Sequence, residues 1–314
     1  MPETQITDGV LLVDKEPEMT SHDVVAIARK RLRIRKIGHT GTLDPLATGL
    51  LVLCVGSATR LQSYLMGMSK TYEGTIRFGW ATRTYDAAGE PTGEVVDRSV
   101  ESIDIEPHVA KFRGSLAQVP PAFSAKKIDG VRAYELARRG ETPEMEPRNV
   151  EVHDFSILAV KGSLVRFRVR CSAGTYVRSI AHDLGGSIGI PAHLHELRRT
   201  TIGDFKVEDA LSLSRLREMA AEEILASPSF VSIGQVRLPL ESVLIDSMQE
   251  GQMINGQTVI VKPQTDTIRQ NDLVSVSNLN YEMVAIAEAV DVIGKGGGPI
   301  ALRPRVVLKK RQQG

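Results

Sequence analysis

Short apolar runs separated by turn residues mark the first part of the chain. Residues 10–13 and 50–55 are continuous apolar runs, which are typical of buried strands, and residues 70–78 alternate as a half-exposed strand does. Residues 20–32 begin with an N-capping Thr-Ser pair and then place apolar side chains on one helical face. Residues 83–95 are rich in Thr, Asp, Gly and Pro, which predicts a loop.

The middle of the chain continues this mixture of strands and helices. Residues 165–170 alternate strictly between apolar residues and arginines, which predicts a strand with one buried face. Residues 171–185 predict a strand end, a glycine turn and a helix, and two more helices are expected near residues 107–114 and 213–225. The pattern therefore predicts an α+β fold in which helices and strands are mixed.

The pattern changes near residues 238–240, where short β-rich runs separated by turns begin to replace helices. These runs cover residues 258–261, 273–276 and 283–288. A length of 314 residues leaves room for two domains, because a domain typically takes about 100 to 200 residues. We therefore predict a large domain at residues 1–236 and a small β-barrel at residues 237–314.

Charge is unevenly distributed along a chain that is nearly neutral overall. The formal net charge is +1, so a nucleic-acid partner requires a local basic surface rather than a basic protein. Six cations lie within residues 29–36, which favours either RNA contact or a solvated helix end. Arg166, Arg168 and Arg170 share one face of their predicted strand. Either an RNA backbone or neighbouring Asp and Glu side chains would supply the anions that these arginines need.

Signals for metals, cofactors and membranes are weak. Cys54 and Cys171 are the only cysteines and form no Cys-x-x-Cys pair, so we expect neither a disulfide nor a structural zinc site. The nearest approach to a metal motif, His193-x-His195-Glu196, has no third ligand group in register. No run approaches the roughly 18 apolar residues of a membrane span. We expect a cytoplasmic protein that requires no metal or cofactor.

One segment, residues 38–49, places a single carboxylate among turn residues between two apolar runs. Its sequence is Gly-His-Thr-Gly-Thr-Leu-Asp-Pro-Leu-Ala-Thr-Gly. The glycines permit positive φ, and Pro45 disfavours the α region for Asp44. Asp44 is therefore a candidate catalytic acid, although Asp-Pro is also a common turn dipeptide whose side chain bonds its own backbone.

This segment resembles, almost residue for residue, the catalytic-loop motif of the TruB family of tRNA pseudouridine synthases. Other segments resemble further motifs of the family in the same order: residues 14–21, 119–138, 174–179 and 197–205. The end of the chain, residues 299–307, is similar to the last strand of PUA domains, which bind RNA. The resemblance implies a central, mainly antiparallel sheet flanked by helices, a helix at the end of the 119–138 motif, and a PUA-like C-terminal barrel.

The first of these matches departs from the family pattern at two positions. Glu16 stands where the family has Pro, and Glu18 stands where it has Gly. If position 18 requires a positive φ, a Glu there is strained. The path of this turn is therefore the least certain part of the resemblance.

The resemblance also implies a catalytic group and its partner. Asp44 matches the family's essential catalytic Asp, and Arg178 matches the Arg that pairs with it. A cation at that place would fix the Asp44 rotamer and lower its pKa. By position alone, a surface salt bridge on a helix is the better explanation of Arg178.

Further matches concern the target base. Tyr72 matches the Tyr that stacks on the base, and Leu197 matches the apolar residue that closes the pocket, although each is equally typical of a core residue. His39 matches a His that fills the space left by flipped bases, while an ordinary turn His is the alternative. Lys15 and Lys127 match lysines near the site and are expected to play supporting roles.

The leading hypothesis is a tRNA pseudouridine synthase that isomerises uridine 55 of the T loop. We expect a monomer that binds the T stem-loop without an obligatory protein partner. Moving the C1′ bond from N1 to C5 involves no net redox change, so no cofactor is required. One alternative is a tRNA-binding folding chaperone whose modification activity is secondary or lost. Another is a glycosidase, for which Asp86 and Asp183 are the available second acids.

Overall fold

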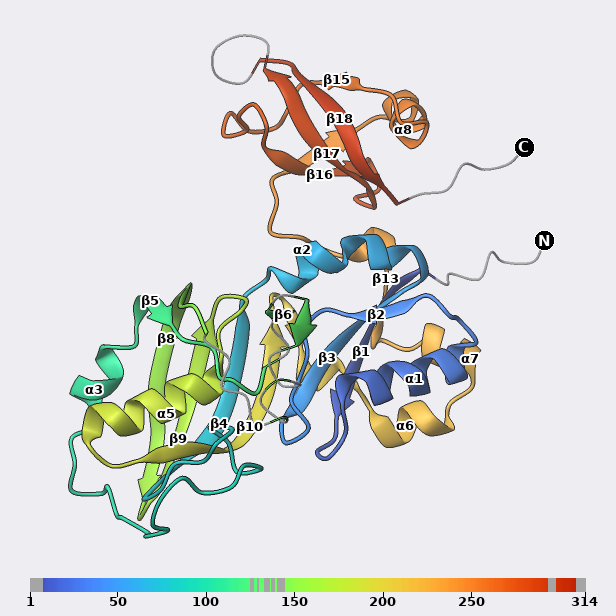
Figure 1. Cartoon of the computed structure of the whole chain (residues 1–314). Coiled ribbons are helices and arrows are strands. Elements are labelled where there is room, and N and C mark those ends of the chain that lie inside the picture. Colours follow the sequence, from blue (N-terminus) through green and yellow to red (C-terminus); the bar gives the residue numbers. More distant parts are fainter. Residues whose placement is uncertain are drawn as a thin grey trace.

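The computed structural model describes residues 8–124, 127–128, 130–132, 136, 139, 145–292 and 298–308 (Figure 1). Two sequence-based predictions lie outside the described residues: the side chain of Lys127 and the helix at the end of the 119–138 motif. The described residues form one large sheet with helices on it, followed by a smaller curled sheet. The predicted mixed α/β class is therefore confirmed.

The large sheet has eleven strands, and its main path follows the order β12-β1-β3-β10-β4-β9-β8-β5. Its strands are β1 (Gly9–Lys15), β2 (Ile37–His39), β3 (Thr48–Val55), β4 (Lys70–Phe78), β5 (Gly114–Gln118), β8 (Arg148–Lys161), β9 (Leu164–Cys171), β10 (Ala192–Ile202), β11 (Phe205–Lys206), β12 (Leu211–Ser212) and β13 (Phe230–Ser232). Only the β1–β12 and β3–β10 pairs are parallel, so the sheet is mainly antiparallel as predicted. A separate short hairpin joins β6 (Lys127–Ile128) and β7 (Val131–Arg132).

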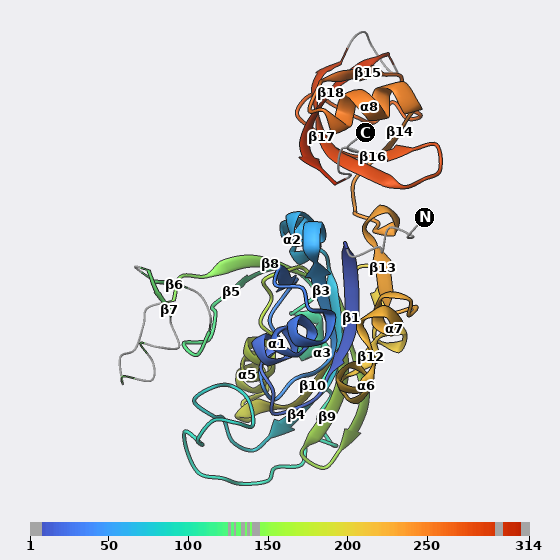
Figure 2. The same cartoon turned by 90° about the vertical axis from the view of Figure 1, so that its right-hand side faces the viewer.

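The continuous apolar runs of β1 and β3 are explained by burial on both faces. Leu11 and Leu51 pack under α1, whereas Leu12 and Leu50 pack in a cluster on the opposite face. The helices are α1 (Ser21–Leu32), α2 (Gln62–Met66), α3 (Glu106–Ala110), α5 (Val177–Ile188), α6 (Leu213–Glu218), α7 (Ala221–Leu225) and α8 (Ser247–Ile254), with a 3₁₀ turn, η1, at Gly56–Leu61. Figure 2 shows α1 and α5 on the same side of the sheet.

Local chemistry explains where several helices begin and end. Thr20 caps α1 in a reciprocal box with Asp23, as the sequence predicts. The single helix predicted at residues 213–225 is wrong, because Met219 and Ala220 adopt extended angles and divide it into α6 and α7. The helix predicted near 107–114 is shorter than expected, because α3 ends at Ala110, and Gly114 at φ +87° then begins β5.

The smaller sheet follows the order β14-β16-β17-β18-β15 and curls into a half-barrel closed by α8. Its strands are β14 (Ser242–Ile245), β15 (Val259–Val261), β16 (Leu273–Asn278), β17 (Met283–Val292) and β18 (Ile300–Val307). Each predicted β-rich run overlaps one of these strands, and only Thr258 falls outside. Met283 and Ile286 extend the apolar cluster beneath β1 and β3, and Arg60 donates a hydrogen bond to the Val307 carbonyl at 2.8 Å.

The arginines of β9 lie on the sheet face opposite the apolar core. Phe167 and Val169 are buried, whereas Arg166, Arg168 and Arg170 are exposed. Arg168 lies 4.0 Å from the carboxylate of Asp154 on β8. The neighbouring Asp154 side chain therefore supplies part of the negative charge on this face.

No helix among the described residues has the length and apolar character that a membrane span requires.

Candidate active site

Asp44 lies in the loop between β2 and β3, and close backbone contacts fix this loop. Gly49 has φ +97°, and a Cβ there would lie 2.3 Å from the carbonyl oxygen of Arg199, so only glycine fits. The Ser21 hydroxyl bonds both the amide (2.9 Å) and the carbonyl (3.2 Å) of Leu43. The amide of Ala47 donates to the Asp44 carbonyl at 3.0 Å and closes the turn.

The turn between β1 and α1 is hydrogen-bonded to the Asp44 loop. The Glu18 amide donates to the Pro45 carbonyl at 2.9 Å. Lys15 is 1% exposed, and its ammonium donates to the carbonyls of Glu16 and Met19, each at 2.8 Å, and of Pro45 at 3.4 Å. Burial lowers the pKa of Lys15 to about 8. Lys15 therefore holds the two turns together and does not line the pocket.

Glu18 has φ +60°, so the strain that the sequence predicts for this position is confirmed. We expect Glu18→Gly to raise the free energy of unfolding by about 0.5 to 1 kcal/mol. Relief of left-handed strain, about 1 to 2 kcal/mol, exceeds the entropy that glycine adds to the unfolded chain. Chemical denaturation measures the change. Glu18→Ala removes the carboxylate but keeps the strain, so an equal gain in that variant would contradict this explanation.

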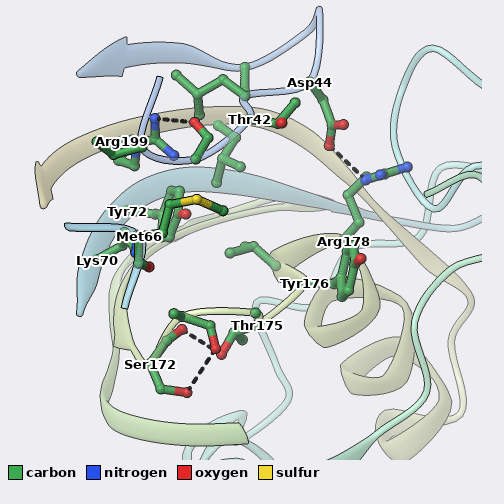
Figure 3. A pocket seen from close by; sticks show the side chains of 18 of the residues that line it. Thr42, Asp44, Met66, Lys70, Tyr72, Ser172, Thr175, Tyr176, Arg178 and Arg199 are labelled. Carbon is green, nitrogen blue, oxygen red and sulfur yellow. Dashed lines mark hydrogen bonds and ion pairs between the residues drawn. The ribbon is translucent and has the colours of Figure 1, made fainter. Parts of the chain in front are cut away.

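Arg178, near the start of α5, forms an ion pair with Asp44 at 2.9 Å (Figure 3). Its guanidinium also lies 3.5 Å from Asp86 and donates to the carbonyls of Thr84 (3.0 Å) and Phe123 (3.1 Å). The Arg178 side chain is 7% exposed, whereas that of Asp44 is 41% exposed toward the pocket. A surface salt bridge is therefore the wrong explanation of Arg178, because four groups fix its guanidinium in the interior.

Burial raises the pKa of Asp44 above its ordinary value, and it outweighs the opposing effect of the Arg178 guanidinium. The nearby Asp86 carboxylate raises the pKa of Asp44 further. The sequence-based expectation of a lowered Asp44 pKa is therefore wrong in its net direction, although Arg178 acts with the predicted sign. A partly desolvated carboxylate held by one guanidinium is suited to accept a proton or to attack an electrophilic carbon.

A cavity of about 550 Å³ opens beside this ion pair (Figure 3). Tyr72 on β4 and Leu197 on β10 line it together with Asp44 and Arg178. Leu197 is 9% exposed. Burial raises the pKa of the Tyr72 hydroxyl, and the Arg199 guanidinium opposes that shift partly through a hydrogen bond. The structure thus brings together four of the predicted site residues in one pocket.

His39 lies beside the pocket but not among the residues that line it. Its ring packs edge-on against His22 with centroids 5.4 Å apart, and its Nδ1 accepts a hydrogen bond from the Gly41 amide at 3.3 Å. Burial lowers the pKa of His39 to about 4, so the ring is neutral at physiological pH.

Sequence reasoning missed Arg199, which is 1% exposed on β10 and lines the pocket. Its guanidinium donates to the carbonyls of Leu50 (2.8 Å) and Gly41 (3.1 Å) and thereby ties the Asp44 loop to the sheet. Its neighbour Arg198 points to the other face and pairs with Asp14 at 2.7 Å. Strand alternation within the Arg-Arg pair is the signal that could have found the buried one.

We expect Arg199→Met to lower the free energy of unfolding by about 3 kcal/mol, because two buried carbonyls lose a charged donor. Arg198→Met is a matched comparison one residue away. Its ion pair is 43% exposed on the arginine side, so its loss is expected to cost about 1 kcal/mol or less. Equal destabilisation of the two variants in urea unfolding would argue that the hydrogen bonds of Arg199 do not hold the Asp44 loop to the sheet.

Asp86 was predicted only as a possible second acid for a glycosidase. It is 5% exposed, belongs to the loop after β4, and does not line the pocket. Its carboxylate faces Arg178 and accepts hydrogen bonds from the Thr84 hydroxyl (2.5 Å) and the Ala88 amide (3.1 Å). Asp183 lies on α5 and does not line the pocket either. The glycosidase hypothesis therefore lacks its second acid, because that mechanism needs two carboxylates flanking one bond.

Within the described ranges, no cluster of three or more His, Cys, Asp or Glu side chains has the arrangement of a metal site. His193 donates a hydrogen bond from Nδ1 to the Trp80 carbonyl (3.0 Å), and both Cys54 and Cys171 are buried free thiols. The described pocket lining supplies one carboxylate (Asp44), two phenols (Tyr72 and Tyr176) and three cations, Lys70, Arg178 and Arg199.

Comparison with known proteins gives this pocket its context. Residues 29–177 match the model of the TruB family pseudouridylate synthase N-terminal domain, and residues 178–245 match the model of the tRNA pseudouridylate synthase B C-terminal domain. The tRNA pseudouridine synthase B of Solibacter usitatus is 43% identical over 283 residues, which are 90% of this chain and 96% of the relative. The chain belongs to the TruB family. It is a tRNA pseudouridine synthase, an isomerase.

Other relatives extend the similarity to the whole chain. The tRNA pseudouridine synthase B of Bacillus cytotoxicus is 38% identical and covers 98% of this chain and 99% of its own. A chain in the crystal structure of the archaeal box H/ACA sRNP Nop10-Cbf5 complex superposes with a TM-score of 0.75 at 26% identity. That match covers 98% of this chain and 88% of the archaeal one. The TruB-like sheet and the small C-terminal sheet thus occur together in relatives.

Proposed function

We propose that this TruB-family synthase converts uridine 55 in the T loop of tRNA to pseudouridine, with Asp44 as the essential catalytic carboxylate. The observation that carries the proposal is the 2.9 Å pair between Asp44 and the buried Arg178 at the wall of the pocket. Both residues belong to segments that resemble the family's motifs. The reaction breaks the bond from C1′ to N1, rotates the uracil and forms the bond from C1′ to C5.

The pocket dimensions support reaction on a nucleotide that has left the RNA stack. A volume of about 550 Å³ accommodates one nucleoside, whereas a base inside a folded loop is out of reach. Flipping costs a few kcal/mol, which stacking on Tyr72 and contact with Leu197 would offset. In this proposal His39, beside the pocket, fills the space that the flipped base leaves. Lys15 and Lys127 have supporting roles in this proposal.

The remaining features of the proposal concern the protein as a whole. Residues 1–236 form the catalytic domain, and residues 237–314 form a PUA-like domain that adds RNA contact. The protein acts as a monomer in the cytoplasm, without an obligatory protein partner. Its substrate is tRNA itself, because the chain aligns along nearly its full length with tRNA pseudouridine synthases.

Chemical mapping of pseudouridine tests the proposal directly. Unmodified tRNA transcript is incubated with the purified protein and mapped by carbodiimide adduct formation. Modification is expected at position 55 alone. A transcript with cytidine at position 55 serves as the matched substrate and should remain unmodified. Product at another uridine in either transcript would overturn the assignment of the position.

A further inference from the structure

A second cavity, of about 350 Å³, shares one lining residue with the catalytic pocket. It is formed where β4 begins and where β9 and β10 end, beside the chain that leads to the small sheet. Its charged lining residues are Arg170, Asp204 and Arg237, and Gly67 is also among its walls. Gly67, in the turn between α2 and β4, lines both cavities, whereas Arg170 lies on the sheet face opposite to Tyr72 and Leu197.

The two arginines of this second cavity have N–H donors that no described protein group accepts from. Arg170 is exposed, and no hydrogen bond or ion pair links its guanidinium to any other described residue. Asp154 lies opposite Arg170 in the β8–β9 register, but its carboxylate is 3.0 Å from the Ser156 hydroxyl and 4.0 Å from Arg168. The guanidinium of Arg170 is therefore available to bind an anion.

Arg237 occupies a different structural position. Its guanidinium donates to the carbonyls of Gly234 (3.3 Å) and Tyr281 (3.2 Å), which belong to the connecting segment and to the β16–β17 turn. A guanidinium has five N–H donors, so several remain available. Asp204 contributes the only carboxylate among the described lining residues, which leaves the cavity with one net positive charge.

We propose that this second cavity binds a backbone phosphate of the RNA strand that carries the target uridine. The inference rests on the proposed function, because a strand whose uridine enters the catalytic pocket brings its own phosphates to the neighbouring surface. Guanidinium groups bind phosphates through paired N–H donors. Because Arg237 also contacts the β16–β17 turn, the bound strand is directed from the catalytic pocket toward the small sheet.

Arg170→Gln tests the site, with Arg166→Gln as its matched control. Arg166 lies on the same face of β9 but outside the cavity. Loss of one phosphate contact is expected to raise KM for unmodified tRNA about two- to fivefold, with the loss in KM rather than in kcat. The slope of log affinity against log salt is expected to fall by about 0.7 to 1. Equal effects of the two substitutions would mean a general electrostatic field and would overturn the proposal.

Two further measurements sharpen the test. Asp204→Asn removes the opposing charge and is expected to lower KM, so a rise in KM would contradict the site. Single methylphosphonate linkages placed around the target uridine should reveal one position that weakens binding to the wild type but not to Arg170→Gln. The absence of such a position would also overturn the site. If the wild type forms no pseudouridine, the proposed function fails, whereas the binding measurements still decide this inference.

Discussion

Asp44→Asn is expected to abolish pseudouridine formation, with a fall in single-turnover rate of about 10⁴-fold or more. Asparagine keeps the shape of the side chain but can neither attack carbon nor accept a proton as a carboxylate does. Arg178 keeps its contacts to Asp86, Thr84 and Phe123, so the pocket wall should persist. The measurement is tritium release or chemical mapping on tRNA with enzyme in excess.

Binding must be measured on the same variant, because product is lost either when the chemical step fails or when the variant no longer binds tRNA. Filter binding of tRNA to Asp44→Asn is expected to stay within about twofold of the wild type, since the side chain is uncharged rather than enlarged. Asp183→Asn, which changes a carboxylate outside the pocket, is the matched control and should remain active. Retention of full activity by Asp44→Asn would show that Asp44 is not the catalytic carboxylate.

The same variant separates an enzyme from a folding chaperone. A chaperone that acts by binding and releasing tRNA needs no catalytic carboxylate, so Asp44→Asn should refold misfolded tRNA as well as the wild type does. Refolding is measured by aminoacylation of the treated tRNA. Persistence of refolding without modification would show that refolding does not require the catalytic carboxylate.

The strands of the large sheet could be predicted because their apolar patterns are local. The run at residues 50–55 is buried on both faces in β3, and the alternation at 165–170 matches the one buried face of β9. Thr20 begins α1 as expected, because capping depends on residues only three apart. Local sequence, however, does not show that extended backbone at Met219 and Ala220 divides α6 from α7.

The parts of the site that escaped prediction depend on contacts between distant segments. Asp86 reaches Arg178 because it pairs with Leu194, on a strand more than one hundred residues further along the chain. The net pKa direction of Asp44 required knowledge of burial, which a motif does not give. The strain at Glu18 was accessible from sequence, since a Glu replaced the Gly of the family motif at a turn.

Arg178→Gln is expected to lower the single-turnover rate by about 10²- to 10³-fold and to change its dependence on pH. The guanidinium fixes the position of Asp44, and a misplacement of about 1 Å can cost about 10²-fold in rate. In the wild type, burial already raises the pKa of Asp44, and Arg178 opposes that rise. Since the ionised carboxylate is the reactive form in our proposal, activity falls as pH falls through this pKa. Loss of the cation raises the pKa further and moves the acidic limb to higher pH.

Two companion substitutions separate the charge of Arg178 from its geometry. Asp86→Asn removes a negative charge that raises the pKa of Asp44, so its acidic limb should move to lower pH, opposite to that of Arg178→Gln. Arg178→Lys keeps the charge, and its limb should stay near that of the wild type. Lysine is a point charge without a planar fork, so it does not reproduce the simultaneous contacts to Asp44, Thr84 and Phe123, and the rate should remain low. If the limb shifts equally in all three variants, a group other than Asp44 controls the acidic side of the pH profile.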